Sequence, residues 1–341
     1  MKLSIIVPVY NMAADKKLEY CLDSLVAQTV GDYEIIAVDD CSTDESWEIL
    51  KSYEKRFPDK FRALHLEENK HQGGAKNEGL KRAQGEWIGF IDSDDWITPD
   101  MYERLIGRAE STGADLVGCD YCLTSEHSMK VGQVVHNNKS SQAGVLDDEK
   151  RRSLILDGGS LVVKIFRRSM IVDHALWFPE HIFYEDNALG NSYLVLARHF
   201  EYIGEPLYYY YQHESSTVHT ISEKRCEDRC EAGRLMLKEA VRHDFLDKYR
   251  PELEYSFTLL FYVNTLFTYM AGVKRTKYRF VKKLGEEMRC RFPDFQENPY
   301  YIERTHEEEK KLIRMQMKST LWFMAYYKLL WAYRHFRKRH G

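Results

Sequence analysis

Three aspartates separated by a single serine follow an apolar segment in the first third of the chain. Asp92, Asp94 and Asp95 come directly after residues 88–91 (Ile-Gly-Phe-Ile). Ionised carboxylates lose hydration when they are buried, so we expect this group at the open end of a strand and not in the core. Carboxylate oxygens are hard ligands that suit Mg²⁺ or Mn²⁺. The motif therefore predicts a divalent-cation site whose remaining positions take the phosphates of a nucleotide.

A second acidic pair, Glu185 and Asp186, stands at the start of a predicted helix downstream. Acids in a first helical turn are ordinary partners of the helix dipole, which is one interpretation. The preceding residues 182–184 (Ile-Phe-Tyr) are apolar, and they favour a closed site around the pair. Since one carboxylate is enough for general-base catalysis, the pair is also a candidate catalytic group.

Apolar runs of strand length alternate with helical segments over the first hundred residues. The predicted strands are residues 3–9, 34–38, 62–66 and 87–91. This alternation predicts βαβ units and a mostly parallel sheet, and ligands of such sheets bind beyond the carboxyl ends of the strands. Asn11, Asp39 and Asp92 fall at those ends, so we expect one crevice to gather them.

The pattern changes from mixed to helical near residue 220. Further strands are predicted at residues 115–119, 161–166 and 207–211. From residue 221 the apolar residues recur at helical spacing with few breakers. We therefore expect an α/β domain at residues 1–220 and an all-helical C-terminal extension at 221–341.

The composition excludes several classes of protein. The chain has 341 residues, 44% of them hydrophobic, and its formal net charge of -4 argues against a general nucleic-acid binder. Residues 1–10 form a predicted strand and not a signal peptide, and no window reaches the ~18 apolar residues of a transmembrane helix. The odd number of cysteines, seven, fits reduced thiols in a reducing compartment.

The end of the chain is basic and aromatic. No acidic residue follows Glu309. The basic residues after it are Lys310, Lys311, Arg314, Lys318, Lys328, Arg334, Arg337, Lys338 and Arg339. Aromatic residues such as Trp322 and Trp331 are interleaved with them, and this mixture suits an anionic membrane surface. The alternative is a helix that packs its aromatic residues against the rest of the protein.

Six segments together resemble the family 2 glycosyltransferases, which are inverting enzymes of the GT-A fold. The segments are SIIVPVYN (4–11), EIIAVDDCSTDES (34–46), GGAKNEGL (73–80), GEWIGFIDSDDWITPDM (85–101), KIFRRSMI (164–171) and FYEDNALGNSYL (183–194). They occur in the family's order over about residues 3–220 and leave the tail uncovered. The resemblance implies a GT-A catalytic domain at 1–220, with a nucleotide-binding half at 1–98 and an acceptor half at 99–220.

The resemblance assigns a nucleotide to residues near the strand ends. Pro8, Tyr10 and Asn11 are expected around the base and ribose, where Tyr10 offers a flat apolar surface. For Pro8 the alternative is a strand terminator. Asp39 is expected to accept the imide N–H of uracil, and Ser93 is included among the nucleotide contacts.

The same resemblance gives different roles to Asp92 and Asp94. It gives Asp92 to ribose and metal and Asp94 to direct metal coordination. Side chains alternate along an extended segment, so Asp95 points the other way and is expected to be structural. A late histidine, His213 or His219, is a further candidate metal ligand, with a surface or core histidine as the alternative.

The remaining assignments concern the diphosphate, the sugar and the acceptor. Lys76 lies in a glycine-opened helix start and is expected near the diphosphate, although the family more often has arginine there. Trp96 and Lys164 are candidates for the donor and acceptor pocket; for Trp96, packing in the core is the alternative. The resemblance makes Asp186 the general base and leaves Glu185 to orient the donor sugar or acceptor.

These assignments predict a hexosyltransferase that moves a sugar from a UDP-sugar to a glycan or lipid-linked glycan, as in capsule synthesis. The expected cofactor is Mn²⁺ or Mg²⁺, no nucleic acid is expected as a partner, and the expected location is the cytoplasm or the inner face of the membrane. One alternative is a catalytically silent nucleotide-sugar-binding scaffold. Another is a nucleotidyltransferase, which would need a glycine-rich phosphate loop where the chain has Tyr10, Asn11 and Met12.

Overall fold

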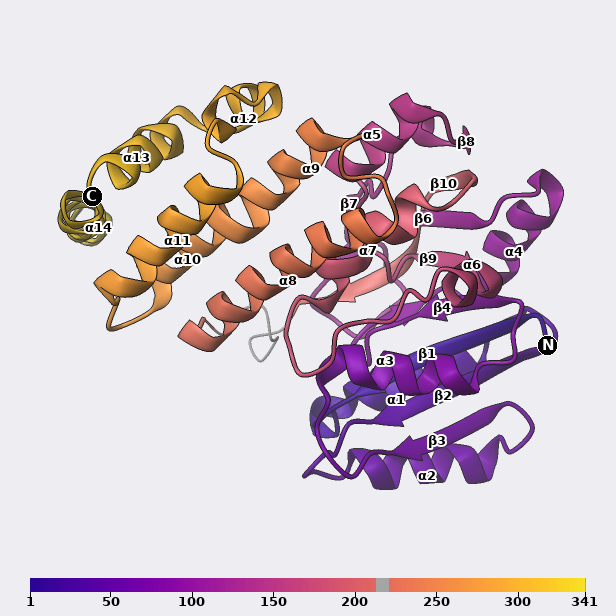
Figure 1. Cartoon of the computed structure of the whole chain (residues 1–341). Helices are drawn as coiled ribbons and strands as arrows, with labels where there is room; N and C mark the ends of the chain where they lie inside the picture. The colour runs from indigo at the N-terminus through magenta and orange to yellow at the C-terminus, as the bar shows by residue number, and fades with distance from the viewer. Residues whose placement is uncertain (213–220, 341) are drawn as a thin grey trace. The chain divides into compact units, whose positions relative to one another are not determined.

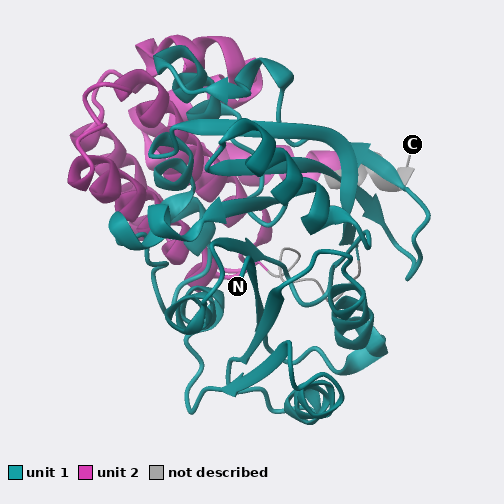
Figure 2. Ribbon diagram, turned by 90° about the vertical axis from the view of Figure 1, so that its right-hand side faces the viewer, with its two compact units in different colours: residues 1–216 teal, residues 217–341 magenta. Residues whose placement is uncertain are grey.

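The computed structural model describes residues 1–212 and 221–340, with side chains to residue 334. The chain divides into two compact units, Met1–Ser216 and Thr217–Gly341, which Figure 2 colours separately. The predicted domain boundary near residue 220 falls at the edge of the segment outside the described residues, so the boundary stays a prediction.

The first unit is built on one mixed sheet (Figure 1). In spatial order its main strands are β3 (Phe61–His65), β2 (Tyr33–Asp39), β1 (Leu3–Val9), β4 (Trp87–Phe90), β9 (Lys164–Arg167), β6 (Leu116–Thr124), β10 (His199–Tyr211) and β5 (Trp96–Ile97). Two short strands, β7 (Gln133–Val135) and β8 (Gly144–Val145), pair with β6 and β10. The first four strands are mutually parallel, whereas β9 and β5 run antiparallel to their neighbours. The predicted α/β fold is confirmed.

Helices cover both faces of this sheet, which explains why every residue of β1 and β2 is buried. Leu3, Ile5 and Val7 of β1 pack in a cluster with α1 (Lys17–Val26), α2 (Ser46–Arg56) and α4 (Met101–Thr112). Ile6 points to the other face, as alternation along a strand requires. That face is covered by α3 (His71–Arg82), α5 (Asp148–Leu156), α6 (Arg168–Asp173) and α7 (Glu185–Val195). An apolar cluster therefore packs on each face of the sheet, and together the two clusters fix the positions of the strand ends.

The second unit is helical throughout its described residues. Its helices are α8 (Glu223–Arg242), α9 (Arg250–Phe257), α10 (Asn264–Gly272), α11 (Tyr278–Arg291), α12 (Pro299–Arg304), α13 (Glu307–Lys318) and α14 (Thr320–His340). A π-helical segment, η4 (Thr258–Val263), joins α9 to α10. The predicted helical C-terminal region is confirmed. None of the helices in the described part of the chain is both long and apolar enough to cross a bilayer.

Candidate active site

The carboxyl ends of three parallel strands place the predicted nucleotide residues at one edge of the sheet. Val9 of β1 lies opposite Asp39 of β2, and Ile6 of β1 lies opposite Phe90 of β4. Asp92 follows β4 directly and is held near α1, because the thiol of Cys21 donates to its carbonyl oxygen at 3.7 Å. The expectation that one edge gathers Asn11, Asp39 and Asp92 agrees with this register.

Asp39 is fully buried and uses only one of its two carboxylate oxygens. Its Oδ2 lies 2.6 Å from Nδ1 of His65 and accepts from the backbone N–H of Ser42 at 3.3 Å. Its Oδ1 is buried without a hydrogen-bond partner among the described residues. A buried acceptor without a donor costs free energy, so this oxygen is suited to an N–H group supplied by a ligand.

Pro8, Tyr10 and Asn11, at the end of β1 and in the loop after it, have different environments. Pro8 is buried within β1, whereas Tyr10 is 46% exposed and offers its ring to solvent. Asn11 has a φ of 53° and ties two loops together. Its Oδ1 accepts from the backbone N–H of Thr43 at 2.8 Å, and its own N–H donates to Ser42 at 2.9 Å. In this structure Asn11 therefore shapes the loop through its hydrogen bonds, and both Tyr10 and Asn11 are exposed.

The aspartate motif after β4 contains a buried carboxylate, Asp92, whose pKa is raised. Oδ1 of Asp92 is buried and has no hydrogen-bond partner among the described residues. Burial raises the pKa of Asp92 to about 7, Lys76 opposes the rise, and the charges of Asp94, Glu185 and Asp186 add to it. The neighbouring Ser93 is buried. The pKa of Asp92 thus depends on charged residues of α3 and α7 as well as on Asp94 of its own loop.

Asp95 has the structural role expected of it. Its side chain is buried, and its Oδ2 accepts from the hydroxyl of Tyr208 at 2.5 Å while Oδ1 accepts from the N–H of Tyr211 at 2.8 Å. Burial, together with the nearby charges of Asp94 and Asp92, raises the pKa of Asp95 well above its usual value. Asp95 therefore anchors the aspartate motif to β10.

Lys76 connects the helix α3 to the start of α7. Its Nζ donates to Oε1 of Glu185 at 2.7 Å, and both side chains are buried. Burial alone would lower the pKa of Lys76, but the charges of Glu185, Asp92 and Asp186 raise it above its usual value. Glycine at position 73 permits this contact, because a Cβ there would lie 2.1 Å from the carbonyl oxygen of Pro179. Lys76 is thus engaged by a carboxylate, and its expected contact with a diphosphate stays a prediction.

Asp186 stands beside this pair and is only partly buried. Its Oδ1 accepts from the backbone N–H of Asn187 at 2.8 Å and from the Asn187 side-chain amide at 2.7 Å. Tyr184, which precedes α7, has a φ of 67°, a conformation that is strained for a residue with a side chain. Lys76 contacts Glu185 directly, and the charge of Asp186 acts on the pKa of both Lys76 and Asp92, so the acidic residues of the two segments lie near the same lysine.

Two residues expected in the pocket lie in the interior and require correction. Trp96 has no exposed surface, and its Nε1 donates to the carbonyl oxygen of Ser128 at 3.0 Å. Lys164 is also fully buried, and its Nζ donates to the carbonyl oxygens of Gly158 at 2.9 Å and Ser160 at 2.7 Å. Burial lowers the pKa of Lys164 to about 7. In this structure neither side chain has a surface with which to line an open pocket.

The residues available for a cation are Asp92 and Asp94. Among the described residues no group of three histidine, cysteine, aspartate or glutamate side chains is placed to hold a metal ion. His213 and His219 lie outside the described residues. The oxygen donors of the motif, with the unpartnered Oδ1 of Asp92, fit Mg²⁺ or Mn²⁺, which commonly take their other ligands from water and phosphate.

One residue at this edge of the sheet, His65, was missed in the sequence, and Asp40, for which a ligand contact and a turn or cap role were both open, is fixed by the backbone. His65 ends β3 opposite Asp39 in the parallel register and binds its carboxylate. Asp40 is buried and accepts from the N–H of Lys70 at 2.7 Å, and burial raises its pKa to about 6. Matching the ends of the second and third predicted strands would have brought His65 next to Asp39.

Comparison with known proteins agrees with this geometry. The profile described as "Glycosyl transferase family 2" matches residues 4–156. The putative glycosyltransferase EpsH of Bacillus subtilis is 33% identical over 310 residues, which cover 87% of this chain and 85% of that protein. The chain belongs to glycosyl transferase family 2. The predicted family and the prediction of a hexosyltransferase are confirmed.

Two other similar proteins have structures solved with a nucleotide sugar. The poly(ribitol-phosphate) beta-N-acetylglucosaminyltransferase TarS of Staphylococcus aureus is 25% identical over 257 residues, 74% of this chain and 43% of that protein. The structure of its residues 1–349 with UDP-GlcNAc matches with a TM-score of 0.59 at 20% identity, over 90% of this chain and 93% of that chain. A mannosyltransferase from Pyrobaculum calidifontis, solved with GDP-Man and Mn²⁺, matches with a TM-score of 0.50 at 12% identity, over 96% of this chain and 86% of that chain. These likenesses support the GT-A fold.

Proposed function

We propose that this glycosyltransferase moves a sugar from a UDP-sugar to a glycan or lipid-linked glycan acceptor, with inversion, in the synthesis of a cell-surface polysaccharide. The observation that carries the proposal is the buried contact of Lys76 with Glu185 at 2.7 Å, next to the strand end that bears Asp92, and the charges of Lys76, Glu185 and Asp186 all act on the pKa of Asp92. These contacts support one site that holds both a donor-binding carboxylate and a candidate base. This is the arrangement that a direct displacement at an anomeric carbon requires.

The buried Oδ1 of Asp39 supports a uracil base. It is an acceptor without a donor among the described residues, and uracil presents an imide N–H where cytosine presents an unprotonated ring nitrogen. The open ring of Tyr10 is placed on the same edge of the sheet to stack on a base. The UDP-GlcNAc complex of TarS is consistent with this choice, and TarS is named for a polymer acceptor.

Asp92 and Asp94 would hold the divalent cation, Mn²⁺ or Mg²⁺. When bound, that cation neutralises negative charge on the diphosphate of the leaving UDP. Lys76 keeps Glu185 in place and contributes positive charge near Asp92. Asp95, anchored by Tyr208, keeps the motif at a fixed position at the end of the sheet.

Asp186 is proposed as the general base. The acceptor hydroxyl oxygen forms the new bond to the anomeric carbon while the bond to the UDP oxygen breaks, and the hydroxyl proton passes to Asp186. Asn187 fixes one carboxylate oxygen of Asp186 and so orients the group. Glu185, whose charge is offset by Lys76, would accept hydrogen bonds from hydroxyl groups of the donor or acceptor.

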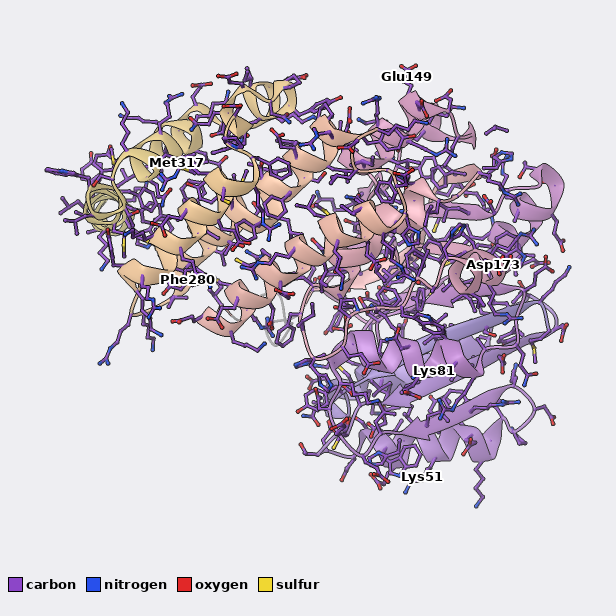
Figure 3. The ribbon with its side chains drawn as sticks, viewed as in Figure 1. Lys51, Lys81, Glu149, Asp173, Phe280 and Met317 are labelled. Atoms are coloured by element: carbon purple, nitrogen blue, oxygen red, sulfur yellow. The ribbon has the colours of Figure 1, made fainter. Side chains whose placement is uncertain are left out.

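The test is the replacement Asp186→Asn, assayed by UDP release from UDP-sugars in the presence of Mn²⁺. We expect kcat to fall about 10²–10⁴-fold, because the proton acceptor is lost, while UDP-sugar affinity stays within a few-fold. Asp173→Asn is the matched control, since Asp173 is an exposed acid of α6 in the same unit, labelled in Figure 3. Full activity of Asp186→Asn would contradict the assignment of the base. UDP-sugar binding without turnover in the unmodified protein would favour a scaffold instead of an enzyme.

A further inference from the structure

Two neighbouring helices of the second unit present a basic and aromatic face to solvent. Lys311, Arg314 and Lys318 are exposed and recur along one side of α13 at successive turns. Trp322 and Leu329 lie two turns apart on one side of α14, as Lys311 and Lys318 do on α13, and they are 73% and 72% exposed. We call these five residues and the partly exposed Tyr326 the α13–α14 face. They line a groove of about 620 Å³, and Figure 3 shows the side chains of both helices, with Met317 of α13 labelled.

The opposite side of α14 packs against the rest of the second unit, so the α13–α14 face is the side that stays exposed. Phe323 and Tyr327 are buried, and the ring of Tyr327 stacks on Phe267 of α10 with the ring centroids 6.1 Å apart. The helix is therefore fixed to its own unit by one side. The other side displays a tryptophan and a leucine that a soluble helix would normally replace with polar residues.

The charge of the α13–α14 face favours an anionic partner. The glutamates of α13, Glu307 to Glu309, lie in its first turn, and Glu307 is near enough to Arg314 to interact with it; the residues that line the groove include three cations and no acid, and no acidic residue follows Glu309. Cations beside interfacial aromatic residues match the phosphates and the acyl boundary of an anionic bilayer. A second copy of the chain is less suited, because opposed faces would bring the three cations of one copy against those of the other.

We propose that the α13–α14 face docks the protein on a bilayer surface that is rich in anionic phospholipid. Trp322 and Leu329 enter the interface between headgroups and acyl chains, while Lys311, Arg314 and Lys318 contact the phosphates. Because none of the described helices can cross a bilayer, the chain lies on the membrane through this face without spanning it there. This inference does not depend on the identity of the donor sugar or of the general base.

The test is co-sedimentation of the full chain with vesicles of phosphatidylglycerol or of phosphatidylcholine. We expect binding to phosphatidylglycerol that weakens as salt is raised, and no binding to phosphatidylcholine. The variant Lys311→Gln/Arg314→Gln/Lys318→Gln should lower the partition coefficient about hundredfold, since each cation near the surface contributes about 1 kcal/mol. Trp322→Ala/Leu329→Ala should lower it at least about tenfold.

A matched control separates this face from general surface charge. Lys282 and Ile302 are exposed elsewhere in the same unit, so Lys282→Gln/Ile302→Ala should sediment like the unmodified protein. Thermal unfolding of every variant checks that the fold is kept. Absence of binding to phosphatidylglycerol, equal loss in the control, or a lipid-free dimer that Trp322→Ala dissociates would each overturn the proposal.

Discussion

Two buried lysines in the first unit have opposite environments. Lys76 of α3 meets the carboxylate of Glu185, and its pKa lies above the usual value. Lys164 of β9 meets only backbone carbonyl oxygens, and burial lowers its pKa to about 7. Burial is therefore not what decides the charge of a lysine here. The presence of a carboxylate partner decides it, and for Lys76 that partner is Glu185 at the start of α7.

The largest expected effect concerns the partnered lysine. Lys76→Met leaves Glu185 buried without its cation and should lower the free energy of unfolding by about 3–5 kcal/mol, measured by urea denaturation. Lys81→Met, on the same helix and labelled in Figure 3, is the matched control, because Lys81 is exposed and its pair with Glu78 should contribute at most about 1 kcal/mol. The double replacement Lys76→Met/Glu185→Leu should recover most of the lost stability. A loss below about 1 kcal/mol in Lys76→Met would show that the pair is not needed.

The second prediction concerns Lys164, which has no carboxylate partner, and the change of stability with pH that its lowered pKa causes. Unfolded Lys164 has a pKa near ~10.4 and the folded residue has a pKa of about 7, so between these values the unfolded chain holds a proton that the folded chain lacks. Stability should therefore rise with pH by about 1.4 kcal/mol per unit over this window. Lys164→Met should remove that share of the slope, measured by urea denaturation at pH 7 to 10. An unchanged slope in the variant would mean that Lys164 stays charged in the fold.

The smallest of the three effects concerns the hydrogen bond from Tyr208 to the buried carboxyl group of Asp95. Tyr208→Phe removes the hydroxyl that donates to Asp95 and should cost about 2 kcal/mol, because a buried carboxyl oxygen is left without its donor. Tyr209→Phe is the control, since its hydroxyl donates only to the carbonyl oxygen of Met129, and we expect a cost of about 1 kcal/mol. Thermal unfolding compares the two. Equal losses would indicate that the full burial of the Asp95 carboxyl group does not strengthen this hydrogen bond.

Local patterns in the sequence predicted the parts of the site that depend on strand order. Asp39 and Asp92 follow apolar runs directly, and parallel strands end at one edge, so their convergence required no knowledge of distant contacts. The alternation of side chains likewise separated Asp95 from Asp92. The helical character of the second unit followed from the spacing of its apolar residues.

The rest depended on contacts between residues far apart in the sequence. Nothing near Lys76 indicates that Glu185 will meet it, because the contact requires α3 and α7 to share one face of the sheet. Trp96 follows the acidic motif but forms β5, which pairs with β10 and so carries the ring into the core. Lys164 is the one charged residue of the apolar run 161–166, and β9 inserts between β4 and β6, so its side chain is buried with the strand.

The most direct test of the account is a crystal structure of the protein with an intact UDP-sugar and Mn²⁺. We predict the uracil at Asp39, the diphosphate beside Asp94, and the hexose ring lying between that motif and the carboxylate of Asp186. A hexose whose anomeric carbon points away from Asp186, with Glu185 and Asp186 remote from the sugar, would contradict the proposal that the two acidic segments serve one reaction.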